Sequence, residues 1–269
     1  MDTVSIEPQS LYSLTGSAQA PLVLDVRRAP RFDADDSMIP GALRPTDDLV
    51  AFVAACPPAR SLVAYCVAGH EVSQDAAAAL RAAGRNAAYL EGGMEAWRAA
   101  NLPTMRRHPE WHVPGRSRWI TRARPKIDRI ACPWLIQRFI DPLARFDYVP
   151  ANDVFDEAKA RDAVPYDLAG AVLTHRGERC SFDAILEDFA LSDPALDRLA
   201  TIVRGADTDR LDLAPESAGL LAASLGLSQR HADDHERLQQ AMPLYDGLYA
   251  WCRREVQGVN ERHSWTPGG

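Results

Sequence analysis

The sequence predicts two unlike domains: an α/β domain with a parallel sheet flanked by helices, followed by an α-rich α+β domain. Between residues 21 and 103 short apolar runs alternate with helical patterns, which is typical of a parallel sheet covered on both faces. Residues 117–257 are mostly helical in pattern. A basic stretch with several prolines separates the two parts. We therefore predict domains at 1–106 and 118–257, joined by a linker at 107–117 and followed by a tail at 258–269.

The first domain contains three strand-like runs, each with a helical pattern near it. The strand-like runs are LVLDV (22–26), SLVAYC (61–66) and NAAYLEGG (86–93), and the helical patterns cover 47–56, 71–84 and 93–103. Pro57, Gly84 and Pro103 end these helices. Functional loops in such folds lie at the carboxyl ends of the strands, which directs attention to residue 66.

Cys66 ends its strand directly before the turn VAGH (67–70) and the helix that follows. A thiol in this position faces free backbone N–H groups and the positive end of the helix dipole. That environment favours the thiolate, which is the nucleophilic form. The alternative is a buried cysteine that acts as a small apolar residue.

Composition narrows the class of protein. The chain has 269 residues, of which 46% are hydrophobic and 25% charged, and a net charge of −7. This acidity argues against a nucleic-acid partner. No apolar run approaches the length of a membrane span, and the N-terminus is too polar for a signal peptide. Five widely spaced cysteines without a CxxC pair favour a reducing cytoplasm over a disulfide framework.

Three strings resemble the signatures of the rhodanese-like sulfurtransferase family: DVR with Phe32 and IPGA (25–42), CVAGHEVS (66–73) and YLEGGMEAW (89–97). The resemblance implies that Cys66 is the catalytic residue, which carries a sulfane sulfur as a persulfide and needs no cofactor. The N–H groups of its loop would bind the outer sulfur. Asp25 and Arg27 would hold that loop through an ion pair. The loop residues are Val67, Ala68, Gly69, His70 and Glu71.

One departure concerns the sulfur donor. Thiosulfate-using members of the family carry Arg or Lys in this loop, where this chain has Val67, His70 and Glu71. A carboxylate beside the loop repels a dianionic donor. We therefore expect a small-molecule or protein persulfide to be a better donor than thiosulfate, with a thiol as the acceptor.

In the second domain, the helical patterns cover 126–140, 181–191, 193–205, 215–226 and 231–257, and the strand-like runs are 117–123, 144–150 and 170–177. His175 ends one of these runs, and Asp207 follows a helix. His235 shares one face of the last helix with His231. Imidazole and carboxylate together suit zinc, iron or manganese. The alternative is that these residues cap helices and face solvent.

The second domain resembles the carboxyl-terminal domain of the chromate-resistance protein ChrB family, through the strings at 124–142, 174–185, 202–215 and 231–253. The resemblance implies a role connected with chromate, which is a candidate ligand. Its polar positions give a candidate metal site at His175, Glu178, Asp207 and His235. Candidates for oxyanion binding are Arg129, Arg176 and Arg204. Cys132 and Cys180 are candidate sulfur acceptors or metal ligands; the alternative is that both are small buried residues.

These observations predict a cytoplasmic sulfurtransferase coupled to a metal- or oxyanion-binding domain associated with chromate and oxidative-stress resistance. In one mechanism the second domain presents the sulfur acceptor to Cys66, because covalent linkage raises the effective concentration of the two domains relative to each other. One alternative is a chromate-responsive regulator that contacts DNA through residues 116–129. Another is a chromate-binding protein with a weakly active first domain.

Overall fold

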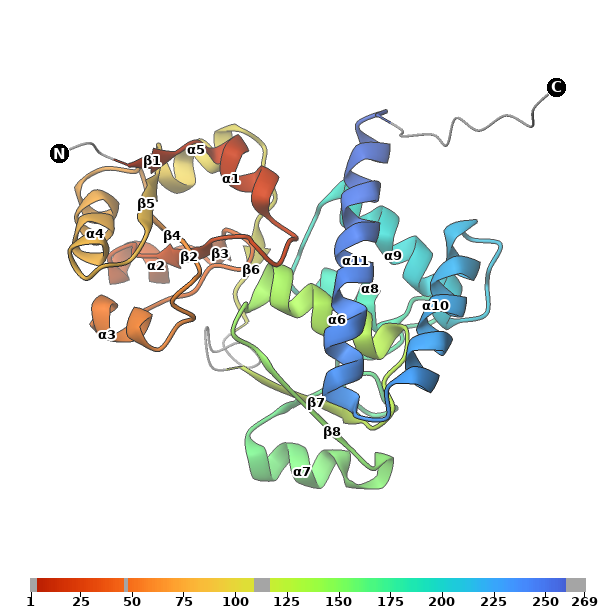
Figure 1. Ribbon diagram of the computed structural model, residues 1–269. Helices are drawn as coiled ribbons and strands as arrows, with labels where there is room; N and C mark the ends of the chain where they lie inside the picture. Colours follow the sequence, from red (N-terminus) through yellow and green to blue (C-terminus); the bar gives the residue numbers. More distant parts are fainter. Residues whose placement is uncertain (1–3, 46–47, 109–116, 260–269) are drawn as a thin grey trace.

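Two domains of different architecture lie side by side in the computed structural model, which describes residues 4–45, 48–108 and 117–259 (Figure 1). Residues 109–116 of the predicted linker and 260–269 of the predicted tail lie outside these ranges. The first domain is α/β, and the second is α-rich with a small sheet, as the sequence predicts.

The first domain is built on a four-stranded parallel sheet in the order β1-β5-β4-β2. A short antiparallel pair, β3 with β6, lies beside it. The strands are β1 (Ser5–Ile6), β2 (Leu22–Asp25), β3 (Ser37–Met38), β4 (Leu62–Tyr65), β5 (Ala87–Leu90) and β6 (Met105–Arg106). The helices are α1 (Pro8–Leu14), α2 (Ala29–Asp33), α3 (Leu49–Ala54), α4 (Glu71–Ala82) and α5 (Gly93–Ala99).

The second domain packs helices against a three-stranded parallel sheet in the order β8-β7-β9. Its strands are β7 (Arg118–Arg122), β8 (Arg145–Val149) and β9 (Val164–Pro165). Its α-helices are α6 (Asp128–Leu135), α7 (Val154–Arg161), α8 (Ser181–Asp188), α9 (Pro194–Asp207), α10 (Glu216–Arg230) and α11 (Asp234–Val256). A π-helical segment, Ile136–Ile140, continues α6, and a 3-10 turn, Ala151–Asp153, precedes α7.

The strand predicted at 170–177 is wrong. Gly170 and Gly177 have φ angles of 90° and 62°, so both ends of the segment turn sharply. Between them Leu173 forms a single bridge to Tyr166, and Val172 is 61% exposed. The apolar alternation there produces an extended loop with isolated bridges at Leu173 and Arg176, because no neighbouring strand among the described residues continues the pairing.

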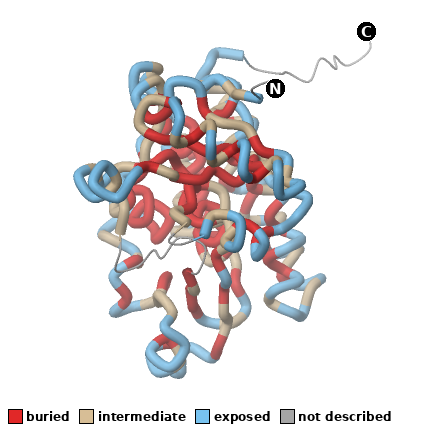
Figure 2. Tube along the Cα trace, turned by 90° about the vertical axis from the view of Figure 1, so that its left-hand side faces the viewer, coloured by how far each residue is buried: buried red, intermediate tan, exposed pale blue. Residues whose placement is uncertain are grey.

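A continuous apolar core joins the two domains. It includes Leu11 and Trp97 from the first domain and Trp134, Phe139 and Tyr249 from the second. The Tyr249 ring lies 5.1 Å from the Phe139 ring and 5.6 Å from the Trp134 ring, measured between centroids. Figure 2 shows buried residues through the interior of the molecule, with exposed residues on the outer helix faces. The domains therefore pack together as parts of one body.

Polar contacts fix this packing at its edge. The Tyr12 hydroxyl donates to Asp193 at 2.6 Å, and the Tyr249 hydroxyl donates to the same carboxylate at 3.1 Å. Asp193 also caps α9 by accepting the N–H groups of Ala195 and Leu196. Because one buried carboxylate serves both domains and a helix end, a shift between the domains would leave several polar groups unsatisfied.

Among the residues described, no helix combines the length and the apolar composition needed to cross a membrane.

Candidate functional site

The loop that carries Cys66 lies between β4 and α4, at the carboxyl edge of the parallel sheet. Cys66 directly follows β4, and His70 is the N-cap residue of α4. The backbone oxygens of Cys66 and Val67 accept hydrogen bonds from the N–H groups of Met94 and Glu95, at 2.9 and 3.0 Å. The start of α5 therefore holds one side of the loop in place.

Two glycines permit this close approach. Gly69 has a φ of 71°, and Gly93 has a φ of 56°, a region that residues with a Cβ rarely adopt. A Cβ on Gly93 would lie 2.4 Å from the Cys66 oxygen and 2.6 Å from the Gly69 nitrogen. The loop and the start of α5 are thus in backbone-to-backbone contact, which leaves no room for a side chain.

Ser73 is a neighbour of the thiol that the sequence analysis did not single out. Its Oγ lies 3.2 Å from the Cys66 Sγ and also donates to the His70 oxygen at 3.1 Å. Ser73 is completely buried in the first turn of α4. Its spacing of seven residues from Cys66 crosses a turn and a helix start, so only the fold reveals the contact.

Beneath the loop, Arg27 and Asp25 form a buried ion pair with N–O distances down to 2.6 Å. The Tyr65 hydroxyl donates to the same carboxylate, at 2.7 Å from Asp25 Oδ2. Arg27 also pairs with Asp35 at 2.8 Å and donates to the Ser37 oxygen. This network ties β2, β4 and β3 together under Cys66.

A cleft of about 640 Å³ opens beside Cys66. Its walls include the cysteine loop and, from α2 and the residue before it, Arg28 and Arg31. Both arginines are exposed. Within the loop itself, the negative charge of Glu71 is unfavourable for an anion. The fold adds two positive charges from a separate element, and their position directly after the DVR string was the signal available.

The remaining four thiols are in different surroundings. Burial raises the pKa of Cys56, Cys132, Cys180 and Cys252, to about 12 for Cys252. These thiols therefore stay protonated and weakly nucleophilic. Cys66 has the largest exposed fraction of the five, 7%, and lines the cleft.

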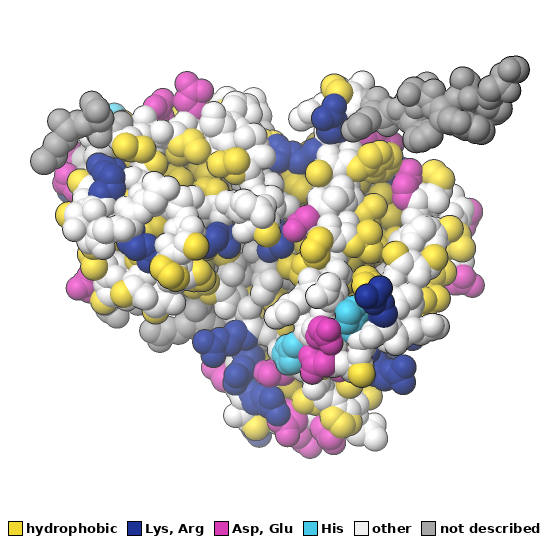
Figure 3. Space-filling model, in the orientation of Figure 1, with side chains coloured by type: hydrophobic (Ala, Val, Ile, Leu, Met, Phe, Trp, Pro, Cys, Tyr) yellow, Lys and Arg dark blue, Asp and Glu magenta, His cyan; other side chains and the backbone are white. Residues whose placement is uncertain are grey.

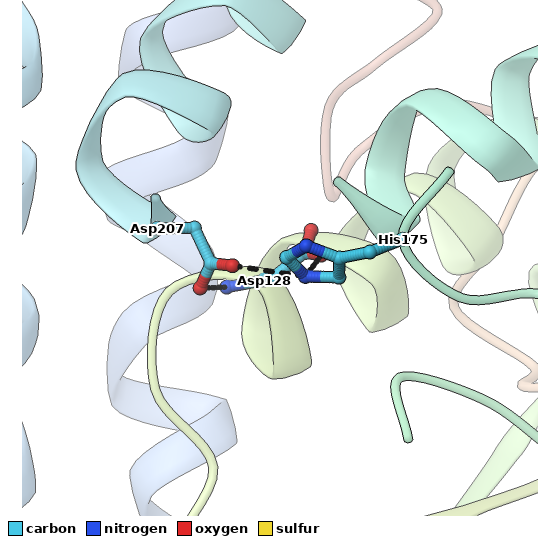
Figure 4. A group of neighbouring side chains, drawn as sticks. All are labelled: Asp128, His175 and Asp207. Carbon is cyan, nitrogen blue, oxygen red and sulfur yellow. Dashed lines mark hydrogen bonds and ion pairs between the residues drawn. The ribbon is translucent and has the colours of Figure 1, made fainter. Parts of the chain in front are cut away.

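A second constellation lies in the other domain, where Asp128, His175 and Asp207 converge (Figure 4). Asp128 is the first residue of α6, Asp207 is the last residue of α9, and His175 lies in the loop before α8. His175 Nε2 lies 3.2 Å from Asp207 Oδ2 and 3.6 Å from Asp128 Oδ2. Each residue offers one potential ligand atom, and these atoms lie within 4.8 Å of one another.

Asp167 is a third carboxylate beside His175, with its Oδ1 3.5 Å from Nε2. Ser181 Oγ donates to that oxygen at 2.7 Å, and Arg129 Nε lies 3.4 Å from Oδ2. Asp167 adopts a φ of 53°. Neither Asp128 nor Asp167 was a candidate from the sequence, because spacing does not show that the ends of α6, α8 and α9 meet.

Asp128 is completely buried and is held by the start of α8. Its two oxygens accept the N–H groups of Ser181 and Phe182, at 2.6 and 3.0 Å. The preceding residue, Ile127, has a φ of 38°, which is strained for a β-branched side chain. The Tyr245 hydroxyl donates to the Ile127 oxygen at 2.9 Å and so helps to hold this conformation.

The pKa values in this group are shifted because several acidic side chains lie close together. Burial, and then the charges of Asp167 and Asp207, raise the pKa of Asp128. Burial and the charge of Asp167 likewise raise the pKa of Asp207. A hydrogen bond to Asp167 raises the pKa of His175, although partial burial opposes that shift. The group therefore favours an added positive charge, carried either by a proton or by a cation.

Two of the four predicted metal ligands lie outside this group. Glu178 is exposed in a turn, and its charge acts on Arg210. His235 is also exposed, and its ring packs 5.5 Å from the Tyr148 ring. His175 and Asp207 are together, so the structure replaces Glu178 and His235 in the candidate set with Asp128.

The predicted oxyanion arginines are engaged with protein carboxylates. Arg176 pairs with Asp188 at 2.6 Å, and Arg204 pairs with Asp183 at 3.1 Å. The cluster of Asp128, His175 and Asp207 is called the Asp–His group below. Arg129 is the one of the three arginines that lies beside it, through its contact with Asp167. Cys132 lies there too, with its Sγ 3.5 Å from Asp128 Oδ1.

Three arginines in the described part of the basic segment 116–129 are paired with carboxylates. Arg118 pairs with Asp147 at 3.1 Å, and Arg122 and Arg129 lie 3.8 and 3.4 Å from Asp167. Figure 3 shows Lys and Arg side chains next to Asp and Glu side chains over this end of the second domain. These pairings reduce the positive potential that a DNA backbone would require.

The two constellations lie in different domains. The residues that line the Cys66 cleft all come from the first domain. Asp128 begins α6, whereas Phe139, near the end of its π-helical continuation, accepts a hydrogen bond from Gly41 of the first domain at 2.6 Å. The helix therefore separates the Asp–His group from the domain contact by about 16 Å along its axis. This arrangement does not support direct presentation of an acceptor to Cys66 by the Asp–His group.

Fold and loop together define a protein class: an α/β domain with a cysteine loop at the carboxyl edge of its sheet, joined to an α-rich partner domain. Residues 7–100 match the family model of the rhodanese-like domain, and residues 119–252 match that of the ChrB, C-terminal domain. The chain therefore joins a rhodanese-like domain to a ChrB C-terminal domain.

Individual proteins show the same two similarities. Protein ChrB of Cupriavidus metallidurans is 38% identical over 152 residues, which are 56% of this chain and 44% of that protein. The match thus spans less than half of the length of that relative. A thiosulfate sulfurtransferase from Pseudomonas aeruginosa is 28% identical, with 38% of this chain and 19% of that chain covered and a TM-score of 0.34. A rhodanese-like domain from Anabaena sp. is 33% identical, with 37% and 76% covered and a TM-score of 0.32.

Proposed function

We propose that this chain is a cytoplasmic sulfurtransferase that carries a sulfane sulfur on Cys66. The observation that supports this most directly is the position of the thiol: it lines an open cleft, follows a parallel strand and precedes the N-terminus of α4. Backbone N–H groups at that position favour an anion on the outer sulfur. The match of residues 7–100 to the rhodanese-like domain supports the same chemistry.

The reaction takes place in two displacements. The Cys66 thiolate attacks the outer sulfur of a persulfide donor, so that a new S–S bond forms at Sγ and the donor S–S bond breaks, with its electron pair leaving on the donor thiolate. A thiol acceptor, as its thiolate, then attacks the outer sulfur and releases the Cys66 thiolate. The loop amides stabilise the outer sulfur between the two steps. When the acceptor departs, the Ser73 hydroxyl turns from the His70 oxygen to donate its one proton to the released thiolate, 3.2 Å away.

The ChrB C-terminal domain, in this proposal, binds a metal ion or an oxyanion and connects sulfur transfer to resistance against chromate or oxidative stress. The match of residues 119–252 supports the connection with ChrB proteins, and the Asp–His group supplies a site for a cation. Because the two sites are separated, the acceptor of the Cys66 sulfur in this proposal is a diffusible thiol.

The experiment that tests this function is mass mapping of the loaded protein. The wild-type chain is incubated with glutathione persulfide, the free thiols are blocked, and the peptides are analysed. We expect one added sulfur, on the peptide that contains Cys66, and its loss when a thiol acceptor is added. Sulfur found on another cysteine, or on none, would contradict the proposal.

A donor preference follows from Arg28 and Arg31. Replacing both by glutamine should raise the KM for glutathione persulfide about 3- to 10-fold, because two exposed charge interactions with the donor carboxylates are lost. The KM for the persulfide of 2-mercaptoethanol, which has no carboxylate, should stay unchanged. Arg230→Gln is the control, since Arg230 is exposed at the end of α10 in the other domain. Equal effects on both donors would show that the arginines do not recognise donor charge.

A further inference from the structure

Three carboxylates from separate parts of the fold point at one imidazole nitrogen. Asp128, Asp167 and Asp207 place an oxygen 3.6, 3.5 and 3.2 Å from His175 Nε2. This nitrogen carries at most one proton, which can be donated well to one acceptor at a time. The other two carboxylates therefore face the same point without a donor from His175. Such convergence is the geometry of a cation site, in which a metal ion takes the place that one proton cannot fill.

The charge balance also favours a cation. With His175 protonated, the three carboxylates still leave an excess of negative charge. Arg129 and Arg122 offset it at Asp167, whose Oδ2 lies 3.4 and 3.8 Å from their nitrogens. Among the described residues, the other two carboxylates share the imidazole as their ion-pair partner. Asp128 is completely buried, and Asp167 is 5% exposed. Buried carboxylates crowded in this way are paired with a positive group or bind a metal ion.

One side of the group faces solvent. The side chain of His175 is 40% exposed and that of Asp207 is 20% exposed, whereas that of Asp128 is completely buried. The three residues would supply ligands from one side and leave the remaining coordination positions to water or a small anion. Three protein ligands with an open position are typical of metal sites that exchange ligands, whereas structural sites are closed by four.

The donor set indicates the kind of metal. Two carboxylates and one imidazole are hard to borderline ligands, which suit Mn²⁺ and Fe²⁺ in six-coordinate sites completed by water. The nearby thiol does not change this choice, because Cys132 is completely buried and its Sγ donates to Asp128 Oδ1 at 3.5 Å.

We propose that Asp128, His175 and Asp207 bind one Mn²⁺ or Fe²⁺ ion in an open, ligand-exchanging site. Asp167, held by Ser181 and Arg129, lies 3.5 Å from the same nitrogen and adds its negative charge beside the ion. This inference rests on the metal- or oxyanion-binding role proposed for the second domain, and not on the chemistry of Cys66.

The test uses the full chain, produced without a histidine tag and freed of metal by dialysis against a chelator. It is titrated with Mn²⁺ alone, and free Mn²⁺ is measured by electron paramagnetic resonance. We expect one saturable site per chain. His175→Ala should weaken the affinity for Mn²⁺ about 100-fold or more, and Asp167→Asn about 10-fold. His175 is partly exposed, so its replacement should leave the fold intact, as circular dichroism can check.

Glu178→Gln and His235→Ala are the matched controls. Both residues are chemically capable ligands of the same domain, and both lie outside the group. Their variants should bind Mn²⁺ as the wild type does. No stoichiometric Mn²⁺ binding by the folded wild type, or equal binding by His175→Ala, would overturn the proposal. Sulfur loading of Cys66, measured in the same variants, reports separately on the first domain.

Discussion

Cys66→Ser is expected to lose sulfur transfer from glutathione persulfide by about 10³-fold or more, because a serine hydroxyl does not ionise at neutral pH and so does not attack the donor sulfur. The other four thiols do not replace it, since burial raises the pKa of each. The measurement is the rate of transfer to a thiol acceptor, together with intact mass after donor treatment. Thermal unfolding should change little, since oxygen for sulfur is a small change in volume at the edge of a cleft.

Cys56→Ser is the matched control for this prediction. Cys56 belongs to the same domain and is 4% exposed, close to the 7% of Cys66, but it does not line the cleft. Its Sγ lies 3.6 Å from the Phe52 oxygen, within its own helix end. This variant should load sulfur on Cys66 at the wild-type rate. If Cys66→Ser transferred sulfur as fast as Cys56→Ser, the sulfur carrier would have to be a different residue.

The sequence was sufficient to predict the class of both domains because their longest elements carry strong patterns. The apolar runs at 22–26 and 61–66 are buried strands, and the alanine-rich stretch after Cys66 is α4. The elements that escaped prediction are short, such as α2 and β9. Tertiary contacts stabilise short elements more than local propensity does, so the sequence carries little signal for them.

The two candidate sites differ in how far the sequence could define them. The Cys66 loop is continuous in the chain, so its motif placed the thiol and the loop residues at one strand end. Ser73, Arg28 and Arg31 depend on how α4 and α2 pack, which a motif does not state. The residues of the Asp–His group, in contrast, lie far apart in the sequence, so no single motif contains them.

In the Asp–His group, side chains meet because the starts of α6 and α8 and the end of α9 lie at one point. His175 and Asp207 stood out as polar residues in loops. Asp128 did not, because an acid in the first turn of a helix ordinarily stabilises the helix dipole. His235 illustrates the opposite case: its spacing from His231 resembles a metal pair on one helix face. That prediction is wrong, because His231 ends α10 and only His235 lies in α11, where its ring packs against Tyr148.

Gly93→Ala is expected to have the second large effect, on stability and on sulfur loading together. Its Cβ would lie 2.4 Å from the Cys66 oxygen and 2.7 Å from the Val67 oxygen, both of them backbone atoms. Strain at a φ of 56° and the forced displacement of the loop should lower the free energy of unfolding by about 3 kcal/mol. Loading of Cys66 should fall at least about 10-fold, because the loop amides lose their alignment.

Gly84→Ala separates the effect of backbone strain from the effect of the steric clash with the cysteine loop. Gly84 has a φ of 79°, so alanine there has the same kind of backbone strain, but a Cβ would meet nothing within 4 Å. This variant should lose only about 1 kcal/mol and keep wild-type loading. Chemical denaturation and mass spectrometry give the two quantities for both variants. If Gly93→Ala lost stability but loaded sulfur normally, the contact between α5 and the cysteine loop would be needed for folding alone. If folded Gly93→Ala instead loads sulfur on Cys66 at least about 10-fold more slowly than Gly84→Ala does, the close backbone contact shapes the anion-binding loop itself.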